Sequence, residues 1–238
     1  ELQNAILLGM NEAETDFGIT SLLIPSIDRE APASAGLEML ELMCAPRHPN
    51  VVGIGMDYNE VNNPPEKFSD AYSLAKKVGL KIKINTVALK NTNENELVHI
   101  MSWAHSNDCD MTIIETMPLG EIDYDRTDQF LPVSKVKRNI EKKYSLKKSD
   151  HYTGGPSRYF EVVETGKRIG FITPLTHNFC ELCNRVRLTC TGKLYMCLGQ
   201  EDSADFKEAS RSLNWKEDLK SAILEAISRK PKGHDFII

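Results

Sequence analysis

No apolar run in this sequence approaches the roughly 20 residues that a membrane-spanning helix needs. The chain also has no recognisable signal peptide, no low-complexity segment and no opening methionine, since it begins at Glu1. We therefore expect no membrane partner, and a chain that was processed, trimmed or cut from a longer one. Hydrophobic residues make up 41% of the 238 residues, enough for the buried core of one large α/β domain or two small ones.

Basic side chains are scarce in the first third of the chain. Residues 1–80 carry 5 basic and 12 acidic side chains, whereas residues 81–238 carry 24 basic and 22 acidic ones. Two differently charged surfaces would explain this asymmetry. Two halves of different origin, with an anion site in the second, would explain it as well.

Cysteines are few, and four of the six lie within 18 residues. They are Cys44, Cys109, Cys180, Cys183, Cys190 and Cys197. A disulfide framework would spread its cysteines along the chain. The clustering therefore favours a metal or cluster site in a reducing compartment.

The first 120 residues alternate short apolar runs with segments of helical periodicity. Strands are predicted at 21–27, 51–57, 81–89 and 110–117. Helices are predicted at 33–44, ended by Pro46, after Pro64, ended by Gly79, and after Asn93, which with Glu96 has the spacing of an N-terminal cap. Repeated βα units imply parallel strands, and four units are half of an eight-stranded barrel.

After Pro132 the pattern changes to α+β. A basic helix is predicted at 134–144. Hairpins are predicted around Thr165-Gly166, with strands at 158–163 and 168–174, and around Thr191-Gly192, with strands at 185–189 and 193–198. The last helix would bury one face, formed by Leu219, Ala222, Ile223 and Ala226. The predicted fold is therefore α/β, a partial parallel barrel followed by an α+β segment.

Cys180 and Cys183 form a C-x2-C pair, a spacing that lets two thiolates bind one metal centre from a tight turn. The Thr191-Gly192 hairpin can bring Cys197 beside that pair. Three thiolates suit a four-iron cluster with one open iron, and they also suit a zinc ion completed by His177. Free buried cysteines are the remaining alternative. Cys190 is expected in the core rather than as a fourth ligand.

Arg185 and Arg187 lie two apart in a strand-like run, so alternation places both on one face. Two guanidinium groups together suit a polyphosphate, because each can grip a phosphate with two hydrogen bonds. A pair of surface arginines in salt bridges is an equally weighted alternative.

Five stretches resemble the C-terminal half of the radical-SAM GTP 3′,8-cyclases, the family that opens molybdenum cofactor synthesis. They are GLKIKINTVALK (79–90), IIETMPLGEI (113–122), GGPSRYF (154–160), RIGFITPLTHNFCELCNRVRLTCTGKLYMCLGQ (168–200) and KPKGHDF (230–236). They follow the family's order, and the C-x2-C-N-R-x-R-L-T run with its distant third cysteine is highly specific.

This resemblance implies roles for particular residues. The ligands of a [4Fe–4S] cluster, whose open iron contacts the guanine of GTP, would be Cys180, Cys183 and Cys197. The GTP-binding residues would be Lys83, Arg185, Val186 and Arg187. Met117 would line the S-adenosylmethionine site. Without the resemblance, Lys83 is an exposed lysine at a strand end and Met117 is a core residue.

The family converts GTP to (8S)-3′,8-cyclo-7,8-dihydroguanosine 5′-triphosphate. Its radical comes from S-adenosylmethionine, cleaved at a second cluster on an N-terminal C-x3-C-x2-C loop. This sequence contains neither that loop nor the family's Gly-Gly tail, so we expect no turnover by this chain alone. The resemblance further implies GTP as the partner, a homodimer as an option, no nucleic acid, and a cytoplasmic location.

Residues 1–80 resemble a different family. GITSLLIPSIDRE (18–30) and the stretch 48–81 are similar to adenosine deaminases, which are zinc-dependent (β/α)8 barrels. The His-x-His pair and the His-Ala-Gly-Glu strand of that family are missing, so its metal site cannot be assigned here. We expect a chimera with a deaminase-like fragment at 1–80 and a cyclase half at 81–238. A purine-deaminase-like hydrolase and a non-catalytic binding module are the rival functions.

Overall fold

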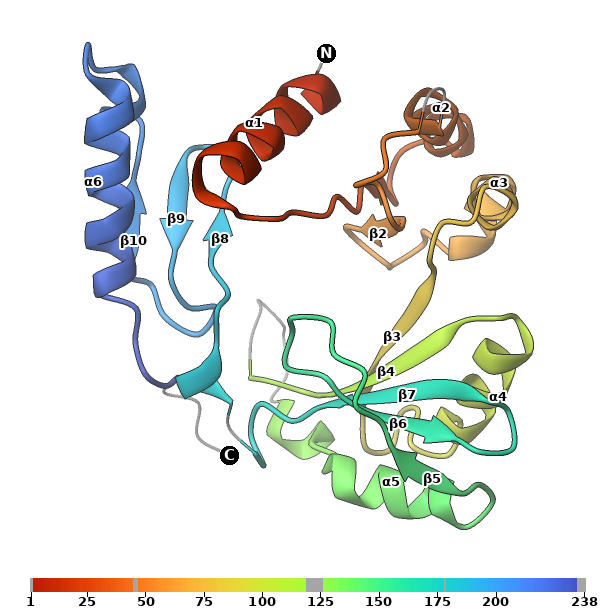
Figure 1. The fold of residues 1–238 in the computed structure, drawn as a ribbon. Coiled ribbons are helices and arrows are strands. Elements are labelled where there is room, and N and C mark those ends of the chain that lie inside the picture. The colour runs from red at the N-terminus through yellow and green to blue at the C-terminus, as the bar shows by residue number, and fades with distance from the viewer. Residues whose placement is uncertain (1, 45–46, 119–125, 178, 235–238) are drawn as a thin grey trace. The chain divides into compact units, whose positions relative to one another are not determined.

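The computed structural model describes residues 2–44, 47–118, 126–177 and 179–234. It is a mixed α/β chain that divides into two compact units, Glu1–Lys83 and Ile84–Ile238 (Figure 1). The α/β class is therefore confirmed. None of the described helices is long and apolar enough to cross a membrane. The unit boundary lies close to the predicted boundary at 80–81, while the separate origin of the two parts stays a prediction.

The described part of the first unit combines α-helices with a small parallel sheet. Its elements are α1 (Leu2–Phe17), β1 (Ser26–Asp28), α2 (Ala33–Cys44), β2 (Gly55–Asp57), the 3-10 turn η1 (Pro65–Phe68) and α3 (Ser69–Lys77). Strands β1 and β2 pair in parallel, as the βα pattern predicts. Ile27, Leu40 and Phe68 are fully buried in the core of this unit. Gly79, with φ +75°, follows α3 as predicted, because few other residues adopt that conformation cheaply.

Two features of the first unit differ from prediction. The ladder spans only three residues of each strand, Ser26–Asp28 and Gly55–Asp57, and isolated parallel bridges such as Leu23 to Val51 extend the pairing. The run 21–27 is not buried on both sides, since Leu22 is 70% exposed. The sequence pattern also missed α1, a helix whose only buried hydrophobic side chain among those described is Leu7. Pro46, predicted to end α2, lies outside the described residues.

The second unit begins with a five-stranded mixed sheet in the order β3-β4-β7-β6-β5. Its elements are β3 (Lys83–Ala88), α4 (Leu97–Ser106), β4 (Asp110–Glu115), η2 (Arg126–Gln129), α5 (Val133–Glu141), β5 (Leu146–Lys148), β6 (Arg158–Val162) and β7 (Lys167–Ile172). Strand β7 runs parallel to β4 and antiparallel to β6 (Figure 1). Helices α4 and α5 pack against β4. The hairpin around Gly166, which has φ +64°, is confirmed.

Asn93 does not cap α4, so that prediction is wrong. Its Oδ1 accepts a hydrogen bond from the Leu89 amide at 2.9 Å, and its Nδ2 donates to the Val87 carbonyl at 2.9 Å. Helix α4 starts later, after Glu96, which makes no side-chain capping bond. The amide side chain is used instead to close the turn that ends β3.

A small antiparallel sheet, β10-β9-β8, and a helix complete the second unit. The elements are η3 (Cys180–Leu182), β8 (Arg187–Leu188), β9 (Lys193–Tyr195), β10 (Ser203–Asp205), η4 (Ala209–Arg211) and α6 (Trp215–Ser228). Leu194, Met196, Phe206 and Ala226 form its own core. The hairpin around Gly192 is confirmed, whereas Ile223, predicted on the buried face of α6, is 38% exposed.

Candidate functional site

The site is built where β4 and β7 end, because the carboxyl ends of parallel strands meet at one edge of a sheet. Glu115, the last residue of β4, is completely buried. Its Oε1 accepts hydrogen bonds from the Val133 amide at 3.2 Å and the Thr176 hydroxyl at 2.6 Å. Its Oε2 accepts the amides of Leu175 and Thr176 at 3.3 and 3.2 Å. One carboxylate therefore joins β4, the start of α5 and the segment that leads from β7 to the cysteines.

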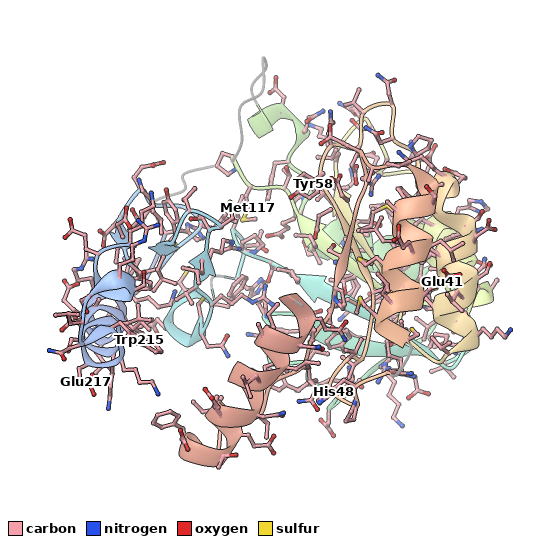
Figure 2. All side chains as sticks on the ribbon, turned by 90° about the horizontal axis from the view of Figure 1, so that it is seen from above. Glu41, His48, Tyr58, Met117, Trp215 and Glu217 are labelled. Atoms are coloured by element: carbon pink, nitrogen blue, oxygen red, sulfur yellow. The ribbon has the colours of Figure 1, made fainter. Side chains whose placement is uncertain are left out.

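Met117 follows two residues after Glu115 and is half-buried (Figure 2). Its place at the carboxyl end of β4 is where a ligand of a parallel sheet would be contacted. The stretch IIETMPLGEI continues to Ile122, and its part from residue 119 lies outside the described residues.

The C-x2-C pair occupies a tight turn, as its spacing predicts. Cys180 opens η3, and the Cys183 amide donates to the Cys180 carbonyl at 3.0 Å. Strands β8 and β9 pair with Arg187 opposite Tyr195, and the ladder ends there, so Arg185 and Cys197 lie just beyond its end. The two segments share one cation, since Lys230 Nζ donates to the carbonyl of Arg185 at 2.9 Å and to that of Met196 at 2.5 Å.

Cysteine thiols are suitable metal ligands, but within the described residues they are not gathered into a ligand set. Cys180, Cys183 and Cys197 are outside any disulfide and half-buried, not fully buried as the alternative of core cysteines required. Within the described residues, however, no three His, Cys, Asp or Glu side chains gather as metal ligands. His177 is exposed. Cys190 is exposed in the hairpin turn, so its predicted place in the core is wrong.

A cavity of about 190 Å³ lies between the loop before β6 and the cysteine segment. The loop contributes residues 152 and 154–158 to its lining. The other side is formed by Phe179, Cys183, Asn184 and Arg185. The structure thus brings a predicted cluster ligand and a predicted GTP-binding arginine to one cavity.

The other predicted GTP-binding residues are not in the lining of this cavity. Arg187 is the first residue of β8 and is exposed, and it is not in the lining of this cavity. Val186, between the two arginines, is 40% exposed. Lys83 is the first residue of β3 and is exposed, in the first unit.

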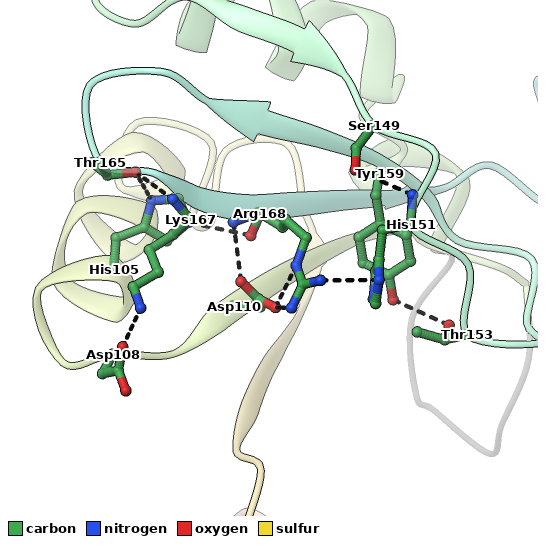
Figure 3. A network of polar contacts seen from close by, with 10 residues as sticks. All are labelled: His105, Asp108, Asp110, Ser149, His151, Thr153, Tyr159, Thr165, Lys167 and Arg168. Carbon is green, nitrogen blue, oxygen red and sulfur yellow. Dashed lines mark hydrogen bonds and ion pairs between the residues drawn. The ribbon is translucent and has the colours of Figure 1, made fainter.

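A polar network supports the loop that lines the cavity (Figure 3). Asp110 Oδ2 accepts Arg168 Nε at 2.9 Å and Nη2 at 2.7 Å, while Oδ1 accepts the Arg168 amide at 3.0 Å. Arg168 Nη1 donates to His151 Nδ1 at 2.9 Å. The His151 ring lies edge-on to Tyr159, whose hydroxyl is 3.3 Å from Thr153 Oγ1. The network therefore connects the start of β4 to the residue before Gly154.

His105, in the last turn of α4, closes the other end of this network (Figure 3). Its Nε2 lies 3.3 Å from the Arg168 carbonyl, and its Nδ1 lies 2.8 Å from Thr165 Oγ1. Burial lowers the pKa of His105 below 6.5 and outweighs the bond to the Arg168 carbonyl, which raises it. Nearby, the hydrogen bond to Asp108 raises the pKa of Lys167. These groups tie α4 to the β6–β7 hairpin.

The fold and the site together define an α/β protein with a cysteine-bearing antiparallel segment at its C-terminal end. Residues 109–236, more than half of the chain, match the family model for Molybdenum Cofactor Synthesis C. The chain belongs to this molybdenum cofactor synthesis family.

Curated relatives point the same way. The chain is 59% identical over 172 residues to a GTP 3′,8-cyclase of Rhizobium leguminosarum bv. trifolii, which covers 72% of this chain and 49% of the relative. It is 58% identical over 164 residues to a GTP 3′,8-cyclase of Brucella ovis, covering 69% and 48% of the two chains. The chain thus spans about half the length of the curated relatives it matches.

Two solved structures are also similar to part of the chain. One is a zinc-bound amidohydrolase from Burkholderia ambifaria, with 28% identity, a TM-score of 0.38, and coverage of 47% of this chain and 36% of the other. The second is an adenine deaminase from Arthrobacter aurescens, with 23% identity, a TM-score of 0.34, and coverage of 47% and 40%. At these TM-scores the likenesses carry no argument.

Sequence reasoning missed three residues of this site: Glu115, Gly155 and Ser157. A carboxylate inside the apolar run TIIETM was a usable signal, because a buried charge requires partners. Nothing local marked Gly155 or Ser157, whose importance depends on segments distant in the chain.

Proposed function

We propose that this chain is the GTP- and iron–sulfur-binding half of a GTP 3′,8-cyclase. The observation that carries the proposal is the cavity that Cys183 and Arg185 line together, a predicted cluster ligand and a predicted phosphate ligand. Lys230 Nζ donates to the carbonyls of both Arg185 and Met196, which supports a place for Cys197 near them. The family match and the curated relatives support the same function.

In this proposal Cys180, Cys183 and Cys197 hold a [4Fe–4S] cluster. The cluster would supply an open iron that coordinates the guanine of GTP. Arg185, Val186 and Arg187 would bind GTP, with the two arginines holding the triphosphate by charge-assisted hydrogen bonds. By resemblance, Lys83 would be a further GTP-binding residue. Met117 would line the S-adenosylmethionine site at the carboxyl end of β4.

The proposal extends to the rest of the chain by resemblance. Strands β1, β2, β3 and β4 would be a fragment of a (β/α) barrel, which their βα order and the parallel β1–β2 pair support. Residues 1–80 would be related to adenosine deaminases. A homodimer, a cytoplasmic location and a reaction without nucleic acid follow from the cyclase resemblance. Conversion of adenosine to inosine by the zinc-loaded chain would favour the purine-deaminase alternative instead.

The test is nucleotide binding by the protein reconstituted with iron and sulfide under anaerobic conditions. Calorimetry should show binding of GTP in preference to ATP. Arg187→Ala should weaken GTP binding about tenfold or more, because one charge-assisted hydrogen bond is lost. Arg229→Ala is the matched control, since Arg229, the residue that follows α6, pairs with Asp202 at 2.6 Å. Equal affinity for ATP, or no effect of Arg187→Ala, would contradict the proposal.

A further inference from the structure

The Arg185 guanidinium lies against Gly155, thirty residues earlier in the chain. A Cβ atom placed on Gly155 would overlap Arg185 Nη2 and would lie 3.5 Å from Arg185 Cζ. The guanidinium therefore occupies the volume that any side chain at position 155 would take. Only glycine leaves that volume free.

The neighbouring residues hold the same two segments together. Asn184 Nδ2 donates to the Gly154 carbonyl at 3.3 Å. Residues 184 and 185 thus contact 154 and 155 as adjacent pairs, and both pairs line the cavity of about 190 Å³. The Asn184 hydrogen bond holds the backbone next to Arg185. The position of the guanidinium therefore depends on that contact as well as on the Arg185 rotamer.

The cavity has the chemistry of an anion site. In the described part of the chain, the ion pairs include neither Arg185 nor Arg158, the two arginines of the lining. Ser157 also lines the cavity, with its buried Oγ turned against Gly170 of β7. Two guanidinium groups outside the described ion pairs match a phosphate.

We propose that Gly155 is a positioning residue, which leaves room for the Arg185 guanidinium to face this cavity and bind a phosphate group of the nucleotide. The inference rests on the proposed function, since it takes the nucleotide as the ligand. Gly155 has neither a charge nor a hydrogen-bonding side chain, so its own chemistry does not mark it as part of a binding site. The inference also places the phosphate that Arg185 binds beside Cys183, in the cavity that both residues line.

A side chain at position 155 should weaken phosphate binding and leave the stability of the fold unchanged. Gly155 is not among the glycines with positive φ, so alanine fits its backbone without strain. The atom that would be displaced is the far end of a flexible arginine, which can swing into solvent. Gly155→Ala should therefore leave the unfolding midpoint unchanged and move only the guanidinium.

The experiment titrates GTP and, separately, inorganic tripolyphosphate into the reconstituted full chain by calorimetry. It compares the parent with Gly155→Ala, Arg185→Ala and the double variant. Arg185→Ala and Gly155→Ala should each weaken binding of both probes, by about tenfold for the arginine variant. The double variant should bind like Arg185→Ala alone, because the glycine acts only through that arginine. Gly9→Ala is the matched control, since a Cβ there meets nothing within 4 Å.

The outcomes separate this inference from the proposed function. If Arg185→Ala binds both probes as the parent does, Arg185 is no phosphate ligand, and the phosphate site and this inference fail together. If Arg185→Ala weakens binding but Gly155→Ala does not, only the inference fails.

A further pair of variants, Arg185→Lys with and without Gly155→Ala, tests whether Gly155→Ala weakens binding for a reason other than its contact with Arg185. Lysine has no Nη2 atom to meet the new Cβ. In the Arg185→Lys background, Gly155→Ala should therefore weaken binding of the two probes little further. An equal added loss in the lysine background would overturn the steric mechanism.

Discussion

Glu115 Oε1 lies 2.6 Å from the hydroxyl of Thr176, sixty-one residues later in the chain. The contact joins the end of β4 to the segment that precedes Cys180. Because Glu115 is fully buried, its carboxylate depends on these donors in place of water. The same contact makes Glu115 a direct probe of how the cysteine segment is held.

Glu115→Gln should destabilise the second unit. An amide group can accept at only one of its two ends, so at least one backbone amide among Val133, Leu175 and Thr176 loses its acceptor. The expected cost is about 2–3 kcal/mol. Both tryptophans, Trp103 and Trp215, lie in the second unit, so urea unfolding followed by their fluorescence measures it.

Glu164→Gln is the control for that substitution. Glu164 also accepts a backbone amide, that of Ser145 at 2.8 Å, but its side chain is exposed and water can replace the bond. Its unfolding midpoint should stay close to that of the parent. Equal losses in the two variants would show that burial of Glu115 does not matter.

Cys183→Ala should abolish the visible charge-transfer absorption and the bound iron of the reconstituted protein, because one of three thiolate ligands is removed. Cys190→Ala should keep both, since Cys190 lies exposed in the hairpin turn. Iron analysis and absorption spectra of the two variants, prepared side by side, measure this difference. A Cys190 variant without iron would overturn the ligand assignment.

The second unit should lose stability in mild acid through His105. Burial lowers its folded-state pKa below 6.5, so below that pH the unfolded chain binds a proton that the folded chain excludes. The contribution of neutral His105 is therefore complete above pH 6.5 and declines as the pH falls below it. Urea midpoints by tryptophan fluorescence should drop with pH more steeply in the parent than in His105→Asn. Parallel pH profiles would show that another group titrates.

Two helical glycines should respond to alanine with opposite signs. At Gly36 in α2, a Cβ would lie 2.8 Å from Phe68 Cδ1 and 3.3 Å from Ile27 Cγ2, inside the core of the first unit. Gly36→Ala should cost about 1–2 kcal/mol, because overpacking outweighs the gain in helix propensity. Gly9→Ala in α1, with open space around it, should gain up to about 1 kcal/mol. Hydrogen exchange of residues 1–83 measures both.

Local chemistry in the sequence determined several elements in advance. Gly79, Gly166 and Gly192 mark a helix end and two hairpins, and all three have positive φ. The C-x2-C spacing gave the turn of η3, and the helix at 33–44 matches α2 to the residue. Each of these depends on backbone preferences within a few residues, which a short stretch of sequence specifies. The C-x2-C-N-R-x-R-L-T run also indicated the family that the comparison then showed.

The contacts that make the site were decided by the tertiary structure. The partners of Glu115 lie 18 to 61 residues away, and Arg185 meets Gly155 across 30 residues. Strand β7 lies beside β4 and parallel to it, although it is far along the chain, and its antiparallel partner β6 makes the sheet mixed. Such pairings depend on which surfaces pack in three dimensions. The sequence supplied the thiols, the guanidinium groups and the buried carboxylate, and packing determined which of them meet.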